Sequence, residues 1–237
     1  NRGCCDNICY SGVADIFRLP KFSLSFFRTQ IAEGSMLPSG KMPYEVFIPA
    51  YRDEILSDTV MVYGNVDEVE LVLNGKTIRR QTADKGPDSD YIPVPNGGNG
   101  KNLHFPPFTF YGVPKERGVL KAVGYHQGKK VAEYTVKTPG VPERLDITYF
   151  ESGKPATKND LLIVYVRMLD KQGVLCPVNG IPVELSVQGG EIVGPTSYPL
   201  EAGVASFLVR TGEISKININ ATGKGFSTRK SLKVGKE

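Results

Sequence analysis

Apolar and polar residues alternate along much of the chain after residue 60, and this period of two predicts β-strands. Asn74-Gly75 and Gln127-Gly128 each lie between two such segments and predict tight hairpin turns, since glycine and asparagine accept positive φ angles. No helical period separates the strands, so a β-sandwich of immunoglobulin type is favoured. The alternating segments in this half are VMVY (60–63), VELVL (69–73), TIRRQ (77–81), HFPPFTF (104–110), VLKAVGY (119–125) and KVAEYTV (130–136).

The same pattern restarts beyond Pro139-Gly140-Val141-Pro142, which predicts a domain boundary. The segment 161–169 alternates most clearly. Leu162, Val164, Val166 and Met168 share one face and are predicted to line a sandwich core, while Leu161, Ile163, Tyr165 and Arg167 share the other. A turn is expected at 170–173. The alternating segments are LDITYF (145–150), LLIVYVRML (161–169), IPVELSV (181–187), GEIV (190–193), GVASFLVR (203–210) and KININAT (216–222).

Residues 13–33 form the one segment with a helical pattern. Asp15 is expected to cap its first turn, Pro20 suits a helix start, and Phe22 and Phe26 stand four residues apart. Apolar residues surround almost the whole circumference, so this helix must be buried against something larger. Residues 35–58, with three prolines, are predicted to be a linker.

The predicted fold is therefore all-β, with two immunoglobulin-like sandwiches in series after one N-terminal α-helix. We divide the chain into 1–42 (loop, helix and linker), 43–140 (first sandwich) and 141–237 (second sandwich).

Composition narrows the class of protein. The 237 residues are 40% hydrophobic and 23% charged, with a net charge of +4, as in an ordinary globular protein. No apolar run is long enough to span a membrane. Lys and Arg are spread evenly, without the concentrated basic face that nucleic acid requires, so neither a membrane span nor a nucleic-acid partner is predicted.

The cysteines do not predict a metal site. Cys4, Cys5 and Cys9 lie together and Cys176 stands alone, whereas zinc needs four ligands and neither His104 nor His126 is near them in sequence. A disulfide scaffold is also disfavoured in domains of this length. Reduced, partly buried thiols are predicted, and the redox compartment stays open.

No catalytic constellation is present in the sequence. The two histidines have no nucleophile motif around them, and the run Asn96-Gly97-Gly98-Asn99-Gly100 reads as a flexible loop rather than a phosphate site. Asp67, Glu68 and Glu70 are interpreted as solvent-facing carboxylates. We assign no catalytic, cofactor-binding or metal-binding residue and predict no cofactor.

Loop tyrosines are the remaining candidates for sugar contact. Tyr51, Tyr91 and Tyr111 lie in or beside loops and could stack on a sugar. Packing of a loop edge with the hydroxyl in water is the more frequent role of such tyrosines.

The segment NRGCCDNICYSGVADIFRLPKFSLSFFRTQ resembles the end of the catalytic barrel in glycoside hydrolase family 2, the β-galactosidase-like enzymes. VMVYGNVDEVELVLNGKTI is similar to a hairpin of the immunoglobulin-like domain that follows the barrel. LLIVYVRMLDKQGVLCPVNGIPVELSVQGGEIVG is similar to the final domain. The matching residues of the first segment are Ser11, Gly12, Asp15, Phe17, Arg18, Pro20 and Lys21.

The resemblance implies a C-terminal, non-catalytic accessory region of a larger glycosidase, with the helix as the last barrel helix. This region would brace the barrel or support substrate or oligomer contacts. The catalytic glutamates would lie upstream, so the fragment alone is expected to be inactive. Its partners would be the catalytic barrel and, through it, a carbohydrate substrate, and homo-oligomerisation stays open.

Two further expectations follow from the family. Members are commonly periplasmic or extracellular, and residues 1–10 resemble a barrel loop. Within that loop Arg2 or Asp6 could approach substrate, although a loop-structuring role is favoured. The alternative hypotheses are an independent carbohydrate-binding or adhesive module pair and, least favoured, a free-standing enzyme.

Overall fold

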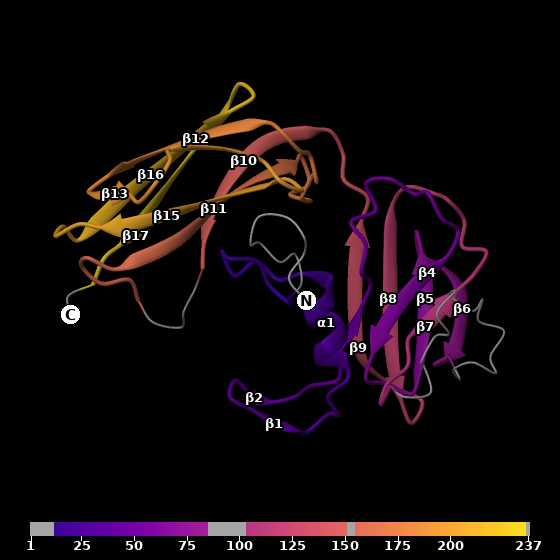
Figure 1. Cartoon of the computed structure of the whole chain (residues 1–237). Helices are drawn as coiled ribbons and strands as arrows, with labels where there is room; N and C mark the ends of the chain where they lie inside the picture. Colours follow the sequence, from indigo (N-terminus) through magenta and orange to yellow (C-terminus); the bar gives the residue numbers. More distant parts are fainter. Residues whose placement is uncertain (1–11, 85–102, 151–154, 236–237) are drawn as a thin grey trace, which may run out of the picture. The chain divides into compact units, whose positions relative to one another are not determined.

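The computed structural model describes residues 12–84, 103–150 and 155–235 of the chain. It divides into two compact units, Asn1–Thr138 and Pro139–Glu237, each built from antiparallel strands (Figure 1). The predicted all-β class with a single helix is confirmed across the described residues. That helix has only eight residues, and no helix among the described residues is long and apolar enough to cross a membrane.

Two sheets enclose the core of the first unit. One has the order β3-β4-β7 and the other the order β6-β5-β8-β9, and a separate two-stranded hairpin, β1-β2, follows the helix. The strands are β1 (Met36–Leu37), β2 (Gly40–Lys41), β3 (Val46–Phe47), β4 (Val60–Gly64), β5 (Glu68–Leu73), β6 (Lys76–Thr82), β7 (Phe108–Phe110), β8 (Val119–His126) and β9 (Lys129–Lys137).

Alternation along β5 explains how this core forms. Val69, Leu71 and Leu73 are buried, and Glu68 and Glu70, which alternate with them, face away from the core. The hairpin turns are as predicted. Asn74-Gly75 has φ angles of 51° and 80°, and Gln127-Gly128 has 49° and 76°, the positive values that two-residue hairpin turns need.

The second unit is a sandwich of two four-stranded sheets, with the orders β10-β11-β15-β13 and β14-β12-β16-β17. Its strands are β10 (Pro142–Tyr149), β11 (Leu161–Asp170), β12 (Pro182–Gln188), β13 (Gly190–Ile192), β14 (Ser197–Pro199), β15 (Val204–Thr211), β16 (Lys216–Gly223) and β17 (Phe226–Lys233). The sequence pattern missed β14 and β17. β17 carries only two apolar side chains in eight residues, Phe226 and Leu232, so its alternation is weak.

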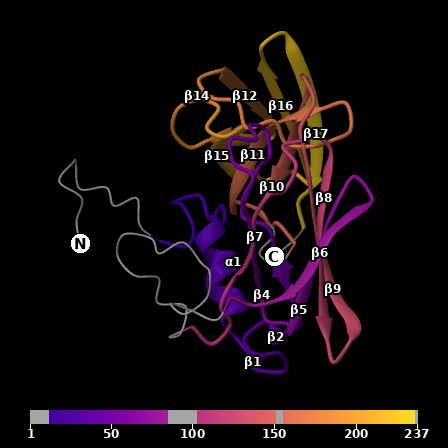
Figure 2. The ribbon, with the colours of Figure 1, turned by 90° about the vertical axis from the view of Figure 1, so that its right-hand side faces the viewer.

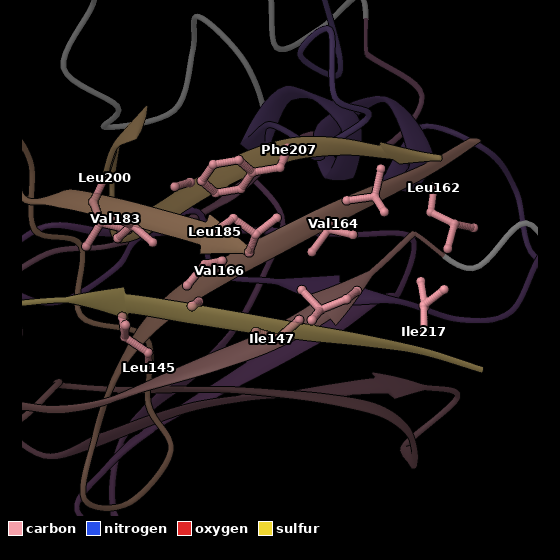
Figure 3. Close-up of a cluster of buried hydrophobic side chains, with 14 of the residues drawn as sticks. Leu145, Ile147, Leu162, Val164, Val166, Val183, Leu185, Leu200, Phe207 and Ile217 are labelled. Atoms are coloured by element: carbon pink, nitrogen blue, oxygen red, sulfur yellow. The ribbon is translucent and has the colours of Figure 1, made fainter. Parts of the chain in front are cut away.

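The core of this sandwich contains the face of β11 that the sequence predicted. Leu162, Val164, Val166 and Met168 are all buried. Figure 3 shows the side chains of Val164 and Phe207 in the same cluster as those of Leu185 and Val183 from the opposite sheet. Truncation of a buried aromatic ring such as Phe207 leaves a cavity that typically costs about 3–5 kcal/mol.

The N-terminal helix differs from its prediction in length. Helix α1 spans only Phe22–Thr29, not 13–33. Asp15 does not cap it; its Oδ1 accepts hydrogen bonds from the backbone N–H groups of Phe17 and Leu19, both at 2.8 Å. A short carboxylate side chain that binds nearby amides stabilises a turn in place of a helix, which is why the pattern overextended.

The expected burial of the helix is also incomplete. Only Thr29 of α1 is fully buried within the described residues, and the ring of Phe27 is 56% exposed. Helix α1 packs against β3 and β4, beside the strands of the first unit (Figures 1 and 2).

The segment predicted as a linker, 35–58, is partly built into the first sandwich. It supplies β3 to the sandwich and forms the separate hairpin of β1 and β2, and the side chains of Val46 and Ile48 join the core. Strands of two residues carry too little periodicity to be detected from the sequence. In the segment 104–110, only Phe108–Phe110 forms a strand, since Pro106 and Pro107 lack the N–H that a ladder requires.

Candidate functional site

Of the three tyrosines that the sequence singled out for sugar contact, Tyr51 and Tyr111 lie within the described residues. Tyr51 is partly exposed and its ring packs on that of Phe22, with centroids 4.9 Å apart. Tyr111 is half-buried next to β7. Tyr91, Arg2, Asp6, Cys4, Cys5, Cys9 and the run Asn96–Gly100 lie outside the described residues.

The acidic residues around β5 stabilise the sheet. The Asp67 carboxylate accepts the backbone N–H of Gln127 at 2.8 Å and contacts Nδ1 of His126 at 3.1 Å. These interactions, led by the Gln127 hydrogen bond, hold the pKa of Asp67 below its usual value. Asp67 thus fixes the β8–β9 turn rather than facing a cleft.

Glu68 and Glu70 belong to a network on the outer face of the same sheet. Glu68 pairs with Arg80 at 2.6 Å, and the guanidinium of Arg80 lies over the ring of Tyr125. Glu70 accepts hydrogen bonds from the hydroxyls of Tyr125 and Thr77, both at 2.7 Å, and these bonds lower the pKa of Glu70. The carboxylates are therefore occupied by neighbours on the strand surface.

His104, His126 and Cys176 lie in three different places and do not form a common site. His104 is exposed beside the Phe105 ring, and His126 stacks on Tyr44 with centroids 4.9 Å apart. Cys176 is buried in the second unit with its Sγ 3.6 Å from the Gly140 carbonyl oxygen, and burial raises the pKa of this thiol. These contacts do not place the Cys176 thiol beside a histidine that could act as its base.

A cavity of about 450 Å³ lies in the first unit, where α1 covers the edge of the sandwich. This is within the roughly 300–1,000 Å³ range of small-molecule sites. Three parts of the chain meet there: α1, the residues that lead into and form β3, and the middle of β9. The lining residues are Ser25, Arg28, Tyr44, Glu45, Val46, Phe47, Ala132, Glu133 and Tyr134.

Polar contacts hold the helix in place over this cavity. The Asn65 amide, almost fully buried, donates to the carbonyl oxygens of Ile31 and Pro43, while its Oδ1 accepts the N–H of Glu45 at 2.6 Å. Gln30 exchanges two hydrogen bonds with the backbone of Phe105, at 2.8 and 3.1 Å. The end of the helix is thereby attached to the sandwich at several points.

The charges that line the cavity are paired. Arg28 makes a two-point ion pair with the carboxylate of Glu45, whose hydrogen bond raises the pKa of the guanidinium. Glu133 is paired with Lys130 at 2.6 Å and lies 3.9 Å from Lys121. The cavity therefore has both signs of charge and no strong net field of its own.

Aromatic rings form the rest of the wall. Phe47 and Tyr134 pack with centroids 4.7 Å apart, and Tyr44 lies on His126. Burial raises the pKa of the Tyr134 phenol, so its hydroxyl stays protonated well above neutral pH. Sequence reasoning missed this site because Tyr44 and Tyr134 come from segments about ninety positions apart, and no local motif joins them.

Apolar side chains gather on the N-terminal segment of the first unit. Ile16, Phe27 and Met36 are 88%, 56% and 74% exposed, and Val13 is also exposed. Single exposed apolar residues are common, but four within 24 residues around one short helix make an unusual concentration.

Arg52 is a second unusual feature of the first unit. Its backbone has a φ of 62°, its side chain is 6% exposed, and Nη2 donates to the carbonyl oxygen of Glu116 at 2.8 Å. Its Nε has no hydrogen-bond partner among the described residues, and burial lowers the pKa of the guanidinium. A buried cation with one neutral partner costs stability, so the fold tolerates strain in this loop.

Comparison with known proteins identifies relatives among glycosidases. A family model described as "Domain of unknown function (DUF4982)" matches residues 57–132. A β-galactosidase of Thermoanaerobacter pseudethanolicus is 33% identical over 218 residues, which cover 87% of this chain and 27% of the relative. A β-galactosidase sequence from Rhizobium radiobacter is 30% identical over 129 residues, 54% of this chain and 92% of that sequence.

Solved structures agree on the fold. A β-glucuronidase from glycoside hydrolase family 2 superposes with a TM-score of 0.74 at 22% identity, over 95% of this chain and 23% of that one. This chain spans only about a quarter of the length of the T. pseudethanolicus enzyme. The ordered similarity across both units confirms the resemblance seen in the sequence. The chain belongs to the β-galactosidase-like enzymes of glycoside hydrolase family 2.

Proposed function

We propose that this chain is a non-catalytic accessory region of a β-galactosidase-like glycoside hydrolase, and that its N-terminal segment braces the catalytic part of the parent enzyme. The relatives extend well beyond the matched region, which supports a larger parent protein. The two carboxylates that line the cavity of the first unit, Glu45 and Glu133, are each ion-paired, and this supports a role outside the chemistry, since a glycosidase needs an available acid and carboxylate.

The observation that carries the proposal is the two-sided character of the segment around α1. One side is attached to the sandwich through Asn65, Gln30 and the Arg28–Glu45 pair. Ile16, before the helix, and Phe27, within it, keep apolar side chains that are exposed. A helix held rigidly with an uncovered apolar side is suited to pack on a further domain, here the barrel that the family resemblance implies.

The first test separates the chain from its parent. The complete reading frame and the 237-residue chain are expressed separately and assayed with p-nitrophenyl β-D-galactoside and p-nitrophenyl β-D-glucuronide. Hydrolysis by the parent alone is expected, and the preferred substrate identifies the sugar. Hydrolysis by the isolated chain at the parent's rate would contradict the accessory role.

The second test addresses the bracing surface. Ile16→Asp and Phe27→Asp in the parent enzyme place charges at the proposed contact and are expected to lower its thermal midpoint and shorten the half-life of its activity. Ile214→Asp, at an exposed apolar position of the second unit, is the matched control. Equal effects of all three substitutions would argue against a specific contact at α1.

We also propose, from the family resemblance, that the parent enzyme is periplasmic or extracellular. Cell fractionation with an antibody against this chain tests the location. Recovery in the cytoplasmic fraction alone would overturn this part of the proposal.

A further inference from the structure

We infer that the cavity under α1 is a non-catalytic binding site for an uncharged saccharide of one or two rings. The inference does not depend on the bracing role, because every lining residue belongs to the first unit. It rests on the chemistry of the wall, the pairing of its charges and the rigidity of its rings.

The wall combines free hydroxyl groups with aromatic rings. Ser25, Tyr44 and Tyr134 line the cavity, and none of their hydroxyls takes part in a hydrogen bond within the chain as described. A cyclic polyol presents C–H groups on its ring faces and hydroxyls around its rim. Rings and hydroxyls in one wall therefore match both kinds of group.

Charge pairing selects an uncharged ligand. Arg28 is neutralised by Glu45, and Glu133 by Lys130, so an ionic ligand would have to displace an existing pair. The paired groups still offer unused guanidinium N–H donors and carboxylate lone pairs to a sugar hydroxyl. An uncharged ligand thus gains polar contacts without the loss of an ion pair.

The rings are held before any ligand arrives. His126 covers one face of Tyr44 and is itself fixed by Asp67 at 3.1 Å. Phe47 packs between Tyr134 and Phe22, with centroid distances of 4.7 and 5.9 Å. A prearranged wall reduces the entropy lost on binding.

The experiment uses the 237-residue chain and ligand-detected NMR titration. D-galactose and lactose are the uncharged probes, and D-galacturonate, which has the ring configuration of D-galactose, is the charged probe. Saturable binding of an uncharged probe is expected with a dissociation constant on the order of 1–10 mM, the range for so small a ligand. Galacturonate is expected to bind more weakly than galactose.

Variants assign the binding to this cavity. Tyr134→Phe and Tyr44→Phe keep the rings and remove the hydroxyls, so each is expected to weaken binding about three- to ten-fold, the equivalent of one hydrogen bond. Tyr198→Phe, in the second unit, is the matched control and should bind as the unaltered chain does. If a tyrosine variant fails to fold, as judged by circular dichroism, Ser25→Ala on the helix replaces it.

Three results would overturn the inference. The first is no saturable binding of either uncharged probe up to about 100 mM. The second is binding that none of the cavity variants weakens. The third is tighter binding of galacturonate than of galactose. Since none of these readouts is glycosidase activity, failure here leaves the accessory role of the chain intact, and failure of that role leaves this site intact.

Discussion

The carboxylate of Asp170 accepts a hydrogen bond at 2.7 Å from the backbone N–H of Gly140, thirty positions earlier in the chain. Its other oxygen accepts the backbone N–H groups of Gln172 and Val174, both at 2.8 Å. One buried side chain thus joins the entry of the second unit to the turn after β11. The position of this segment depends on an ionised group inside the fold.

This carboxylate predicts a pH-dependent stability. Burial alone would raise the pKa of Asp170, but the backbone hydrogen bonds, led by that of Gly140, outweigh it and leave the pKa below its usual value of about 3.9. A lowered pKa in the folded state contributes stability that is present above about pH 4 and is lost as the pH falls through the folded-state value.

Asp170→Asn tests that contribution. The amide cannot accept with both ends, so the variant is expected to lose about 1–3 kcal/mol of unfolding free energy at pH 7 and progressively less below pH 4. Urea unfolding followed by circular dichroism measures it. Asp146→Asn, on a partly exposed strand position, is the control. A pH-independent difference between Asp170→Asn and the unaltered chain would contradict the electrostatic origin.

The hydrogen bonds of Asn65 are expected to contribute to the stability of the helix attachment. Asn65→Asp keeps the acceptor for Glu45 N–H but removes both donors and places a charge against the carbonyl oxygens of Ile31 and Pro43. Loss of about 2–4 kcal/mol is expected, because each buried group left without a partner costs roughly 1–3 kcal/mol. Urea unfolding gives the magnitude.

Limited proteolysis shows where the Asn65→Asp change acts. Faster cleavage between residues 30 and 43 than in the unaltered chain is expected, with the second unit unaffected. Asn179→Asp, on an exposed loop of that unit, serves as the control. An unchanged cleavage pattern would mean that Asn65 does not hold the helix.

Two glycines of the second unit have the same backbone conformation but differ in the space available to a side chain. Gly203 and Gly225 have φ angles of 82° and 79°. A Cβ on Gly203 would lie 2.1 Å from the carbonyl oxygen of Cys176, whereas one on Gly225 would meet nothing within 4 Å.

Alanine at each glycine should therefore have unequal effects. Gly225→Ala is expected to cost about 1–2 kcal/mol from the left-handed backbone alone. Gly203→Ala adds a backbone clash and is expected to cost about 2–5 kcal/mol in total. The thermal unfolding midpoints of the two variants are compared. Equal midpoints would show that the backbone around Gly203 shifts enough to relieve the clash.

Replacement of the buried Arg52 by an apolar residue is expected to change the stability little, unlike the substitutions above. Arg52→Met removes a guanidinium that has one carbonyl partner, so stability should change by less than about 1 kcal/mol in either direction. Arg52→Glu, which buries the opposite charge beside the same carbonyl, should cost several kcal/mol. Urea unfolding separates the two. A large loss in Arg52→Met would mean that the buried cation has a partner that stabilises it.

Local sequence patterns predicted most of the strands, because the features that define a strand, alternation and turn residues, lie at neighbouring positions. Val69, Leu71 and Leu73 alternate with polar residues, and Asn74-Gly75 defines the turn that follows. The same reasoning failed at α1, where Asp15 favours a turn, and at β17, whose outward residues dominate its composition. It could not detect the cavity, since Tyr44 and Tyr134 become neighbours only when β3 and β9 meet.

The sequence alone determined the class of fold, the positions of most strands along the chain and its membership of a glycosidase family, because alternation, turn residues and ordered motifs are properties of neighbouring positions. The tertiary structure decided the length of the helix, the place of β3 in the first sandwich and the cavity under α1. Those features depend on contacts between distant segments, such as Asn65 with Ile31 and Gln30 with Phe105. Such contacts stabilise the fold only once the distant segments have been brought together, which costs loop-closure entropy.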